Sequence, residues 1–383
     1  MKEAFEHHLK TKIIPFWTNL ADYDNGGFFG HISSDHVIDR EAPKGLVQQS
    51  RFLWSFSALA NYYRSKEFRK LADHAFCFLI DRFHCDKTGG FSWLVDYKGV
   101  QIDKRIATYG QAFAIYALSE YYMLSRRPEA LDLAIATFER IEAIAYDQSL
   151  DGYHEEFDQD WRLLKPELLS DGIDGVVFTG NTLIHLLEAY TNLFKASRNE
   201  SVRSGIQKIV RILENNLCYR SHSGLAMYLD HQYKPVSLER HYGHEIEFSW
   251  LLDETMDIIG LKPESWCKLT LDLAISAVKD GWNGRFITPT SVSDSYNHIW
   301  WVSSEALVGI WNLYLKTKDE AYRNKLITLH KSIQEDLVDP DPAGEWFWSK
   351  ELANGSKAPR GMGELWKTPY HNVRAILKLL ERM

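Results

Sequence analysis

Two histidines of this chain stand where predicted helices begin, beside groups that suit proton transfer. In YGHEIEFSWLL, His244 and Glu247 are three residues apart and share one face of a helix. A carboxylate that fixes the tautomer of a histidine equips it as a general base, so we expect Glu247 to orient His244. In WKTPYHNVRAILKLL, Thr368 and Pro369 predict a helix start that puts His371 in the first turn. The positive helix end disfavours the imidazolium there, which leaves His371 suited to shuttle protons.

Two other segments place polar groups on apolar helices. In GNTLIHLLEAYTNLF, Asn181, His185 and Glu188 share one face. In QSRFLWSF, Arg51 opens a helix that is otherwise apolar. A guanidinium in that position either pairs with a glutamate for structure or stabilises an oxyanion. Both segments are therefore candidates for a site at which negative charge develops.

Aromatic side chains are abundant and suit a saccharide cleft. They make up 13% of the chain, which includes 13 Trp. In HIWWVSSEALVG, Trp300 and Trp301 are candidate platforms for a sugar ring, and Glu305 follows one turn later. Tryptophan is also an effective core residue, so each Trp alone also fits a structural role.

Each polar motif also has a structural interpretation. His244 with Glu247 fits a surface ion pair, His371 fits a residue near a helix cap, and His185 fits a satisfied core histidine. These alternatives weaken when the motifs are taken together. If the helices run parallel, their polar residues, all near the helix starts, meet at one mouth.

A turn that combines glycine or a small residue with aromatic residues recurs six times along the chain. The six copies are GGFFG from Gly26, GGFSW from Gly89, DGYHEEFD from Asp151, SGLAMYLD from Ser223, DGWNGRF from Asp280 and AGEWFWS from Ala343. A regular recurrence of this kind indicates a repeat architecture. A helix follows each turn, opening with polar and aromatic residues and continuing with apolar ones.

The helical periodicity predicts six pairs of helices. Amphipathic helices are expected near 2–20, 65–83, 128–145, 198–217, 263–280 and 318–337. Apolar helices are expected near 48–63, 107–124, 179–195, 243–259, 299–316 and 369–382, and their apolar character predicts that they are buried. This pattern predicts an all-α (α/α)6 barrel with short β-hairpin loops at the catalytic mouth. An open solenoid is the alternative, but it would need a polar capping repeat at each end. With no linker in the pattern, we expect residues 1–383 to form a single domain.

The bulk composition excludes several classes of protein. The net charge of −8 comes without a basic stripe, which argues against nucleic-acid binding. No apolar run approaches the length of a membrane span, and the first residues do not form a signal peptide. The four cysteines lack metal-ligand spacing and are expected to be reduced and buried. We therefore expect a cytoplasmic protein, either a monomer or a homodimer.

Taken in order, these segments closely resemble the N-acylglucosamine 2-epimerase superfamily, and within it the cellobiose 2-epimerase branch. YGHEIEFSWLL, WKTPYHN, WWVSSEA, NTLIHLLEAYT and the early IIPFW, DNGGFFG and SRFLW segments carry the resemblance, which covers nearly the whole chain. It implies an (α/α)6 barrel and a reaction that needs no metal or redox cofactor.

The resemblance also implies roles for individual residues. His244 and His371 match the two acid–base histidines of the family, and His185 matches a third histidine that assists ring opening and anchors the substrate. The positions that match the lining of the sugar site are Arg51, Glu247, Asn181, Tyr109, Trp250, Trp301 and Trp366, and we add Trp54 from SRFLW as a candidate.

Two segments depart from the cellobiose epimerase pattern. Ser303 and Ser304 stand where that branch has a sequence closer to WWVQAEA, and residues 280–298 lack its acidic, glycine-rich run. Both segments are expected near the second sugar ring of a disaccharide. A β-1,4-linked disaccharide such as cellobiose is the leading substrate, and free mannose is the alternative.

The residues predict a cofactor-independent inversion at C2 of an aldose. The aldehyde at C1 acidifies the C2 proton, and two histidines on opposite faces can remove and return it. If the proton returns to C1 instead, the product is a ketose, so an aldose–ketose isomerase remains open.

Three other functions remain as alternatives. An inverting glycoside hydrolase on this barrel would need two carboxylates about 6.5–9.5 Å apart, for which Glu155, Glu156, Asp160 and Glu305 are available. A sugar-binding module without activity and a metal enzyme that uses the His and Glu residues are the others.

Overall fold

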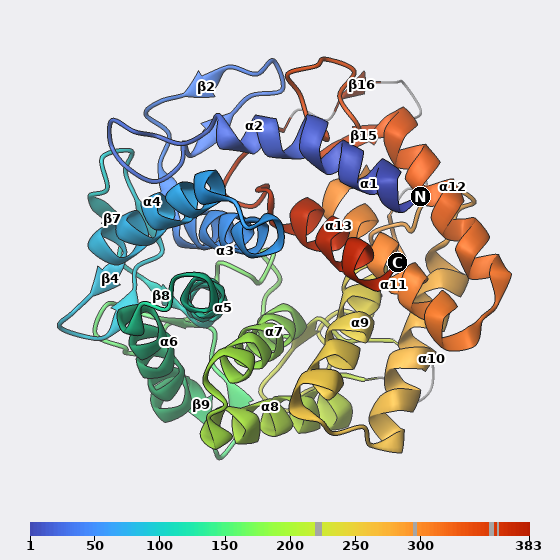
Figure 1. Ribbon diagram of the computed structural model, residues 1–383. Helices are drawn as coiled ribbons and strands as arrows, with labels where there is room; N and C mark the ends of the chain where they lie inside the picture. Colours follow the sequence, from blue (N-terminus) through green and yellow to red (C-terminus); the bar gives the residue numbers. More distant parts are fainter. Residues whose placement is uncertain (219–223, 294–296, 352–355, 358–359) are drawn as a thin grey trace.

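Six inner helices form a closed ring in the computed structural model, which describes residues 1–218, 224–293, 297–351, 356–357 and 360–383. Consecutive inner helices pack against one another, and the last packs against the first (Figure 1). The inner helices are α3 (Leu46–Tyr63), α5 (Thr108–Ser125), α7 (Gly180–Ser197), α9 (Tyr242–Ile259), α11 (Trp300–Thr317) and α13 (Tyr370–Arg382). The closed ring confirms the predicted (α/α)6 barrel and excludes the open solenoid.

An outer layer of helices surrounds this ring. Its members are α1 (Lys2–His8), η1 (Leu9–Ile13), α2 (Ile14–Thr18), α4 (Lys66–Arg82), α6 (Pro128–Arg140), η2 (Ile141–Ala145), α8 (Glu200–Ile212), η3 (Leu213–Leu217), α10 (Glu264–Gly281) and α12 (Glu320–Asp336). The predicted ranges agree with these bounds to within a few residues. The three η segments are π-helical turns that the periodicity did not predict. At the end of the first segment, the backbone N–H of Ile14 donates to the carbonyl oxygen of Leu9, five residues back. The next residue, Pro15 at the start of α2, has no backbone N–H to donate.

Burial separates the two layers as the sequence predicts. In α5, every residue from Thr108 to Tyr121 is buried, whereas α8 buries only one stripe. Each inner helix from α3 to α11 ends at a residue in the left-handed region, which turns the chain back toward the outer layer. These features repeat in each unit, so all the inner helices begin at the same end of the barrel.

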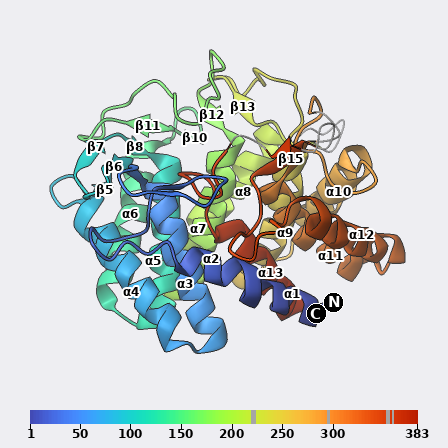
Figure 2. The same ribbon diagram turned by 90° about the horizontal axis from the view of Figure 1, so that it is seen from above.

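Short strands gather at the end where the inner helices begin (Figure 2). They are β1 (His31–Ile32), β2 (Ile38–Asp39), β3 (Lys44–Gly45), β4 (His84–Cys85), β5 (Gly90–Phe91), β6 (Leu94–Val95), β7 (Gln101–Asp103), β8 (Ile106–Ala107), β9 (Tyr146–Asp147), β10 (Gly152–Tyr153), β11 (Glu156–Phe157), β12 (Phe178–Thr179), β13 (Tyr228–Leu229), β14 (Asn297–Ile299), β15 (Ser349–Glu351) and β16 (Ser356–Lys357). All their pairings are antiparallel, and together they form the rim of the mouth.

The recurring turns have a common backbone feature in several repeats. Gly27 (φ +67), Gly89 (φ +65) and Gly284 (φ +100) adopt the left-handed region, and Asp151 (φ 50) takes its place in the third turn. Ser223, at the start of the fourth turn, lies outside the described residues. The left-handed position explains the glycine in the first, second and fifth of these turns.

No helix in the described ranges is long and apolar enough to cross a membrane. All four cysteines are free thiols, as expected. The expectation that they are buried is wrong, because Cys77 is exposed and the other three are half-buried.

Candidate active site

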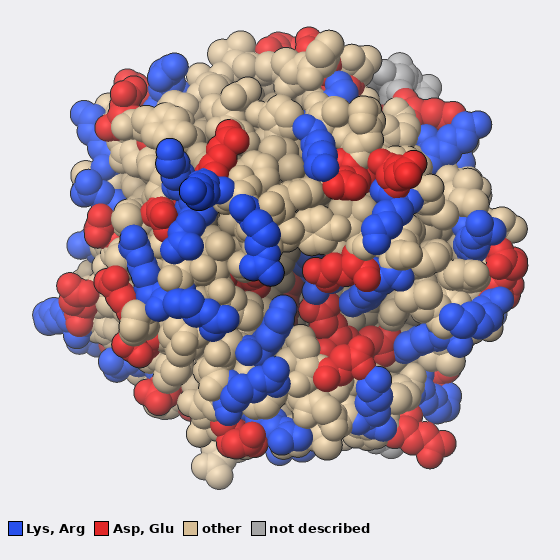
Figure 3. Space-filling view, in the orientation of Figure 1, with Lys and Arg blue, Asp and Glu red and all other residues tan. Residues whose placement is uncertain are grey.

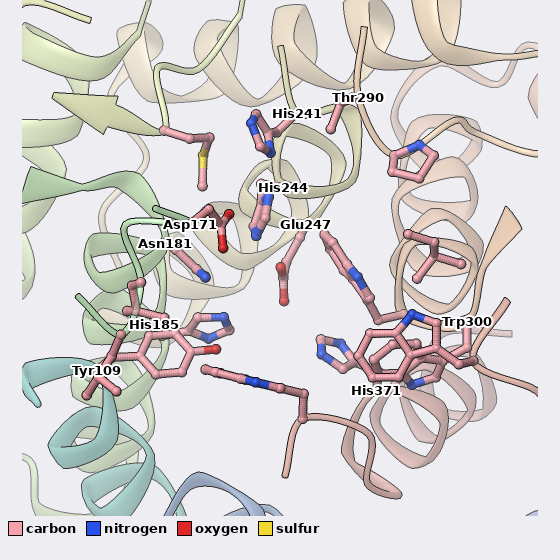
Figure 4. A pocket seen from close by; sticks show the side chains of 18 of the residues that line it. Tyr109, Asp171, Asn181, His185, His241, His244, Glu247, Thr290, Trp300 and His371 are labelled. Carbon is pink, nitrogen blue, oxygen red and sulfur yellow. The ribbon is translucent and has the colours of Figure 1, made fainter. Parts of the chain in front are cut away.

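A cavity of about 430 Å³ opens at the end of the barrel where the inner helices begin. Its lining comes from all six inner helices and from the loops of the rim (Figure 4). The lining residues are Arg51, Tyr109, Leu168, Leu169, Asp171, Asn181, His185, Met227, Tyr228, His241, His244, Glu247, Pro289, Thr290, Ile299, Trp300, Trp301, Trp348, Arg360, Trp366 and His371. Nine of the eleven predicted site residues are therefore brought together in one cavity.

The first two turns of the inner helices supply the polar groups of this cavity. Asn181 and His185 lie at the second and sixth positions of α7, whose start is capped by the side chain of Thr179. His244 and Glu247 occupy the third and sixth positions of α9, and His371 the second position of α13. The three histidines surround the open centre of the cavity from three different helices (Figure 4).

Trp54 and Trp250 are the two predicted site residues that do not line this cavity. Both line a small separate space deeper in the barrel. Trp250 is 1% exposed and donates its indole N–H to Glu305 Oε2 at 3.0 Å. Trp54 stacks on Tyr116. Each sits further along its helix than the cavity residues, which puts it below the floor of the site, so neither is in a position to contact a substrate in the mouth.

His371 is held by a buried carboxylate. Its Nδ1 lies 2.6 Å from Glu305 Oε1, and Glu305 is fully buried. Burial, with the nearby Arg51 and Arg374, holds the pKa of His371 well below its ordinary value. Burial also raises the pKa of Glu305, although Arg374 opposes this. The pair therefore fixes the ring and leaves His371 neutral and able to accept a proton through Nε2.

His185 has the same arrangement on the opposite side. Its Nδ1 lies 3.0 Å from Glu188 Oε2, one turn along the same helix. Burial alone would raise the pKa of Glu188, but Arg374 and His185 hold it well below the ordinary value. The sequence predicted that the two residues share a face, and the structure adds the hydrogen bond.

His244 differs from the other two histidines. Its Nδ1 has no hydrogen-bond partner among the described residues. Burial and the neighbouring His241, His185 and His371 hold its pKa well below the ordinary value. The expectation that Glu247 orients His244 by a hydrogen bond is wrong, because Glu247 instead accepts a hydrogen bond from Arg374 at 2.6 Å.

Trp301 connects the two histidines that the sequence predicts as acid and base. Its ring centroid lies 4.7 Å from that of His244 and 5.8 Å from that of His371. A planar apolar surface between two imidazoles suits the face of a sugar. The position of Trp301 agrees with its predicted role as a platform.

Arg51 is fixed by contacts on several sides. Its Nη1 donates to the carbonyl oxygen of Trp366 at 2.7 Å, and its Nη2 donates to the hydroxyl of Tyr109 at 3.2 Å. The guanidinium lies 4.4 Å from the ring centroid of Phe113 and 4.9 Å from that of Tyr370. A cation held in this way at a cavity wall suits the stabilisation of an oxyanion.

Several cavity residues escaped the sequence argument because they come from loops. Asp171 accepts a hydrogen bond from the Tyr228 hydroxyl. His241 lies beside His244 with ring centroids 5.7 Å apart. The histidine pair was visible as HYGH, three residues apart, but Asp171 lies in a segment with no helical or strand periodicity.

The carboxylates considered for a hydrolase do not meet in the cavity. Glu155 accepts hydrogen bonds from Thr179 N and the Thr182 hydroxyl at the start of α7. Glu156 accepts backbone hydrogen bonds in the rim, and Asp160 is exposed. None of these three lines the cavity, and Glu305 lies beneath His371. These four residues therefore do not form the carboxylate pair that an inverting hydrolase needs.

A metal would compete with a side chain already in place. Among the described residues, Glu247, Glu305 and His371 have ligand atoms within 4.8 Å of one another. Arg374 Nη2, however, donates to Glu247 Oε1 at 2.6 Å and to Glu305 Oε1 at 2.7 Å. A guanidinium thus occupies the place between the carboxylates, and these residues do not fit a resident metal ion.

Glu247→Gln is expected to change how stability depends on pH. Burial and the neighbouring Glu305 raise the pKa of Glu247 to about 7. The native state then binds a proton that the unfolded state releases above its ordinary pKa, so the wild type loses stability as pH rises from about 4.5 to 7. The variant lacks this loss of stability, which amounts to about 3 kcal/mol. Thermal unfolding between pH 4.5 and 8 measures the difference.

The matched control for that measurement is Glu254→Gln. The pKa of Glu254 is lowered because Lys378 and Arg382 outweigh its burial. Glu254→Gln should therefore lower the stability at neutral pH, and the pH dependence that it removes has the opposite sign to that of Glu247. If the melting temperatures of the wild type and Glu247→Gln depend on pH in the same way, Glu247 is ionised in the native state over the whole range from pH 4.5 to 8.

The chain matches the family model of N-acylglucosamine 2-epimerase over residues 27–375. It belongs to this family. The match confirms the resemblance stated from the sequence and identifies the protein as a carbohydrate epimerase, an enzyme of the isomerase class.

Individual relatives match along their whole length. A cellobiose 2-epimerase of Dictyoglomus turgidum is 38% identical, with 100% of this chain and 98% of the relative covered. The structure of a cellobiose 2-epimerase from Bacillus thermoamylovorans superposes with a TM-score of 0.97 at 32% identity, covering 100% and 99% of the chains. A D-mannose isomerase of Marinomonas mediterranea is 24% identical, with 100% and 98% covered.

The two departures from the family pattern have different outcomes. Ser303 and Ser304 are buried and donate to the backbone carbonyls of Ile299 and Trp300. They do not line the cavity, so the expectation that they lie near a second sugar ring is wrong. Within residues 280–298, Pro289 and Thr290 do line the cavity, whereas 294–296 lie outside the described residues.

Proposed function

We propose that residues 1–383 form the single catalytic domain of a cytoplasmic 2-epimerase that inverts C2 at the reducing end of a cellobiose-type β-1,4-linked disaccharide. The observation that carries the proposal is the convergence of His244 and His371 from different helices on one cavity, in a chain of this family. The identity to cellobiose 2-epimerases supports the disaccharide as substrate.

The two histidines would act as a pair of bases. One neutral histidine takes the C2 proton of the open-chain aldose, and the electron pair of the C–H bond becomes the enediolate. The other histidine, protonated, gives its proton to the opposite face of C2. Burial favours the neutral form of each ring, so a bound proton is readily passed on.

Other cavity residues would support this exchange. Arg51 would stabilise the negative oxygen of the enediolate. His185, held by Glu188, would assist ring opening and anchor the substrate. Tyr109, Asn181, Trp301 and Trp366 would bind the sugar, and Glu247 would contact it from the floor of the cavity.

The second candidate is an enzyme of free mannose, either a 2-epimerase or an aldose–ketose isomerase. The similarity to a D-mannose isomerase favours it. The same enediolate gives a ketose when the proton returns to C1, so the chemistry needs no additional residue.

Incubation in deuterium oxide tests both candidates. The enzyme is mixed separately with cellobiose, lactose, mannose and glucose, and NMR reads the products and the deuterium at C2. A C2 epimer labelled at C2 supports the epimerase, whereas a ketose labelled at C1 supports the isomerase. Released monosaccharide from cellobiose, or no label from any sugar, would contradict both. A parallel sample with a chelator is expected to keep full activity.

We expect kcat/KM to be higher for cellobiose than for mannose. A second ring contacts the mouth, and its binding lowers the barrier at C2 when the contacts persist in the transition state. Trp366→Ala should reduce kcat/KM for both sugars, because Trp366 lines the cavity with its ring centroid 6.0 Å from that of Tyr109, where both sugars would bind. Steady-state kinetics with each sugar measures the ratio, and a higher kcat/KM for mannose would favour the second candidate.

A further inference from the structure

We propose that Arg374 is a positioning residue that holds the carboxylates behind His185 and His371 in one hydrogen-bonded unit and so fixes both imidazoles for proton transfer. The inference rests on the proposed function and adds a residue that the sequence motifs did not single out.

Arg374 joins three inner helices through one buried guanidinium. Its Nη1 donates to Glu188 Oε1 and to the hydroxyl of Tyr370. Its Nη2 donates to Glu247 Oε1 at 2.6 Å and to Glu305 Oε1 at 2.7 Å. The side chain is 0% exposed, and it belongs to α13, whereas the three carboxylates come from α7, α9 and α11.

Two of these carboxylates hold histidines with their remaining lone pairs. Glu188 binds His185 Nδ1, and Glu305 binds His371 Nδ1. The two imidazoles on opposite sides of the cavity are therefore attached to a single cation. A planar fork suits this geometry because it donates in fixed directions to several oxygens, which an ammonium group cannot do.

The charge of the unit explains how buried histidines can carry a proton. Three carboxylates against one guanidinium leave a net charge of −2 when all are ionised. A proton on Glu247, whose pKa is raised to about 7, reduces this to −1. One protonated histidine then brings the net charge of the unit to zero. The unit can therefore balance the charge of one imidazolium at a time.

Arg374 itself does not line the cavity that holds the histidines. It lies beneath the floor and borders a separate hollow of about 480 Å³ at the opposite end of the barrel. That hollow lies on the face shown in Figure 3, and basic and acidic side chains gather around the centre of this face. Arg374 therefore acts through the carboxylates and not by touching the sugar.

The test compares Arg374→Lys with Arg382→Lys in the full chain. Arg382 is a matched control. It is two turns further along α13, and both arginines lie over the Trp250 ring. Arg382 pairs with Glu254 and contacts none of the three carboxylates. In Arg374→Lys we expect kcat for C2 epimerisation to fall by about 10²-fold, with KM within about threefold. Arg382→Lys should match the wild type.

The pH profile separates positioning from general stability. A lysine cannot approach all three carboxylates, so their pKa values rise. Glu188 and Glu305 then take up protons at higher pH, and the acidic limb of kcat should shift upward. Nitrogen-15 NMR of the imidazoles should show weakened Nδ1–H hydrogen bonds at both His185 and His371.

Each outcome decides between the interpretations. Wild-type kcat and pH profile in Arg374→Lys would overturn the proposal, as would a lower melting temperature with unchanged kcat. If Arg374→Lys does not fold, the double variant Arg374→Gln/Glu247→Gln removes one cation and one anion together, and the NMR measurement decides. If the wild type acts on no sugar, the proposed function fails, yet the NMR comparison still tests Arg374.

Discussion

Replacing His244 or His371 with alanine is expected to lower the turnover of C2 epimerisation by at least about 10²-fold. Each imidazole lines the cavity from a separate helix, and burial keeps each one near its neutral form. Two bases on opposite faces of C2 are both required for inversion, so the loss of either one blocks the full reaction. Steady-state assays with cellobiose measure the loss, and circular dichroism verifies the fold.

Deuterium exchange gives the two-base assignment a sharper test. With one base missing, the remaining histidine can still remove the C2 proton of one epimer and exchange it with solvent. His244→Ala and His371→Ala should therefore label opposite epimers without interconverting them. His84→Ala, which removes a histidine paired with Asp86 outside the cavity, serves as the control and should keep full activity. Label in both epimers from either single variant would mean that one base serves both faces.

Local patterns in the sequence predicted the helices and the ring well. Apolar periodicity gave the inner helices to within a few residues, and left-handed turn positions explain Gly27, Gly89 and Gly284 of the recurring turns. The predicted location of His185, His244 and His371 near helix starts followed from caps and helical spacing. Because parallel helices begin at the same end, placing the helix starts also placed these residues in one cavity.

Pairings between distant helices were not predictable in the same way. Arg374 reads as one more basic residue in HNVRAILKLL, and nothing local indicates that it meets Glu188, Glu247 and Glu305. Helical spacing suggested that Glu247 binds His244, three residues away. The guanidinium of Arg374 on α13 donates to that carboxylate instead, and local helical spacing does not show a contact between residues so far apart in the sequence.

Residue spacing along a helix also did not predict how deep in the barrel the cavity ends. Trp250 is three residues beyond Glu247, and Trp54 is three residues beyond Arg51. Helical spacing puts each near the same face as a cavity residue but about one turn deeper. In both cases that turn carries the side chain past the floor of the cavity.

Arg51→Ala is expected to lower kcat by about 10²–10³-fold, the range for losing one donor to a developing oxyanion. Its guanidinium is held against Phe113 and Tyr370 and by the Trp366 carbonyl, so it needs no rearrangement as charge develops. Arg51→Lys should recover only part of the rate, because an ammonium cannot make the same set of contacts. Kinetics of both variants at saturating sugar measure the effect.

The same change should move the acidic limb of the pH–rate profile upward. Burial and then Arg51 lower the pKa of His371, so removing the cation lets that pKa rise. His371 must be neutral to accept the C2 proton, and its protonation would then begin at higher pH. Arg360→Ala is the matched control, since Arg360 lines the outer cavity over Trp348 at 4.2 Å and should leave the limb in place. A lower rate in Arg51→Ala with an unmoved limb would separate oxyanion stabilisation from the tuning of His371, and an unchanged rate would remove Arg51 from the reaction.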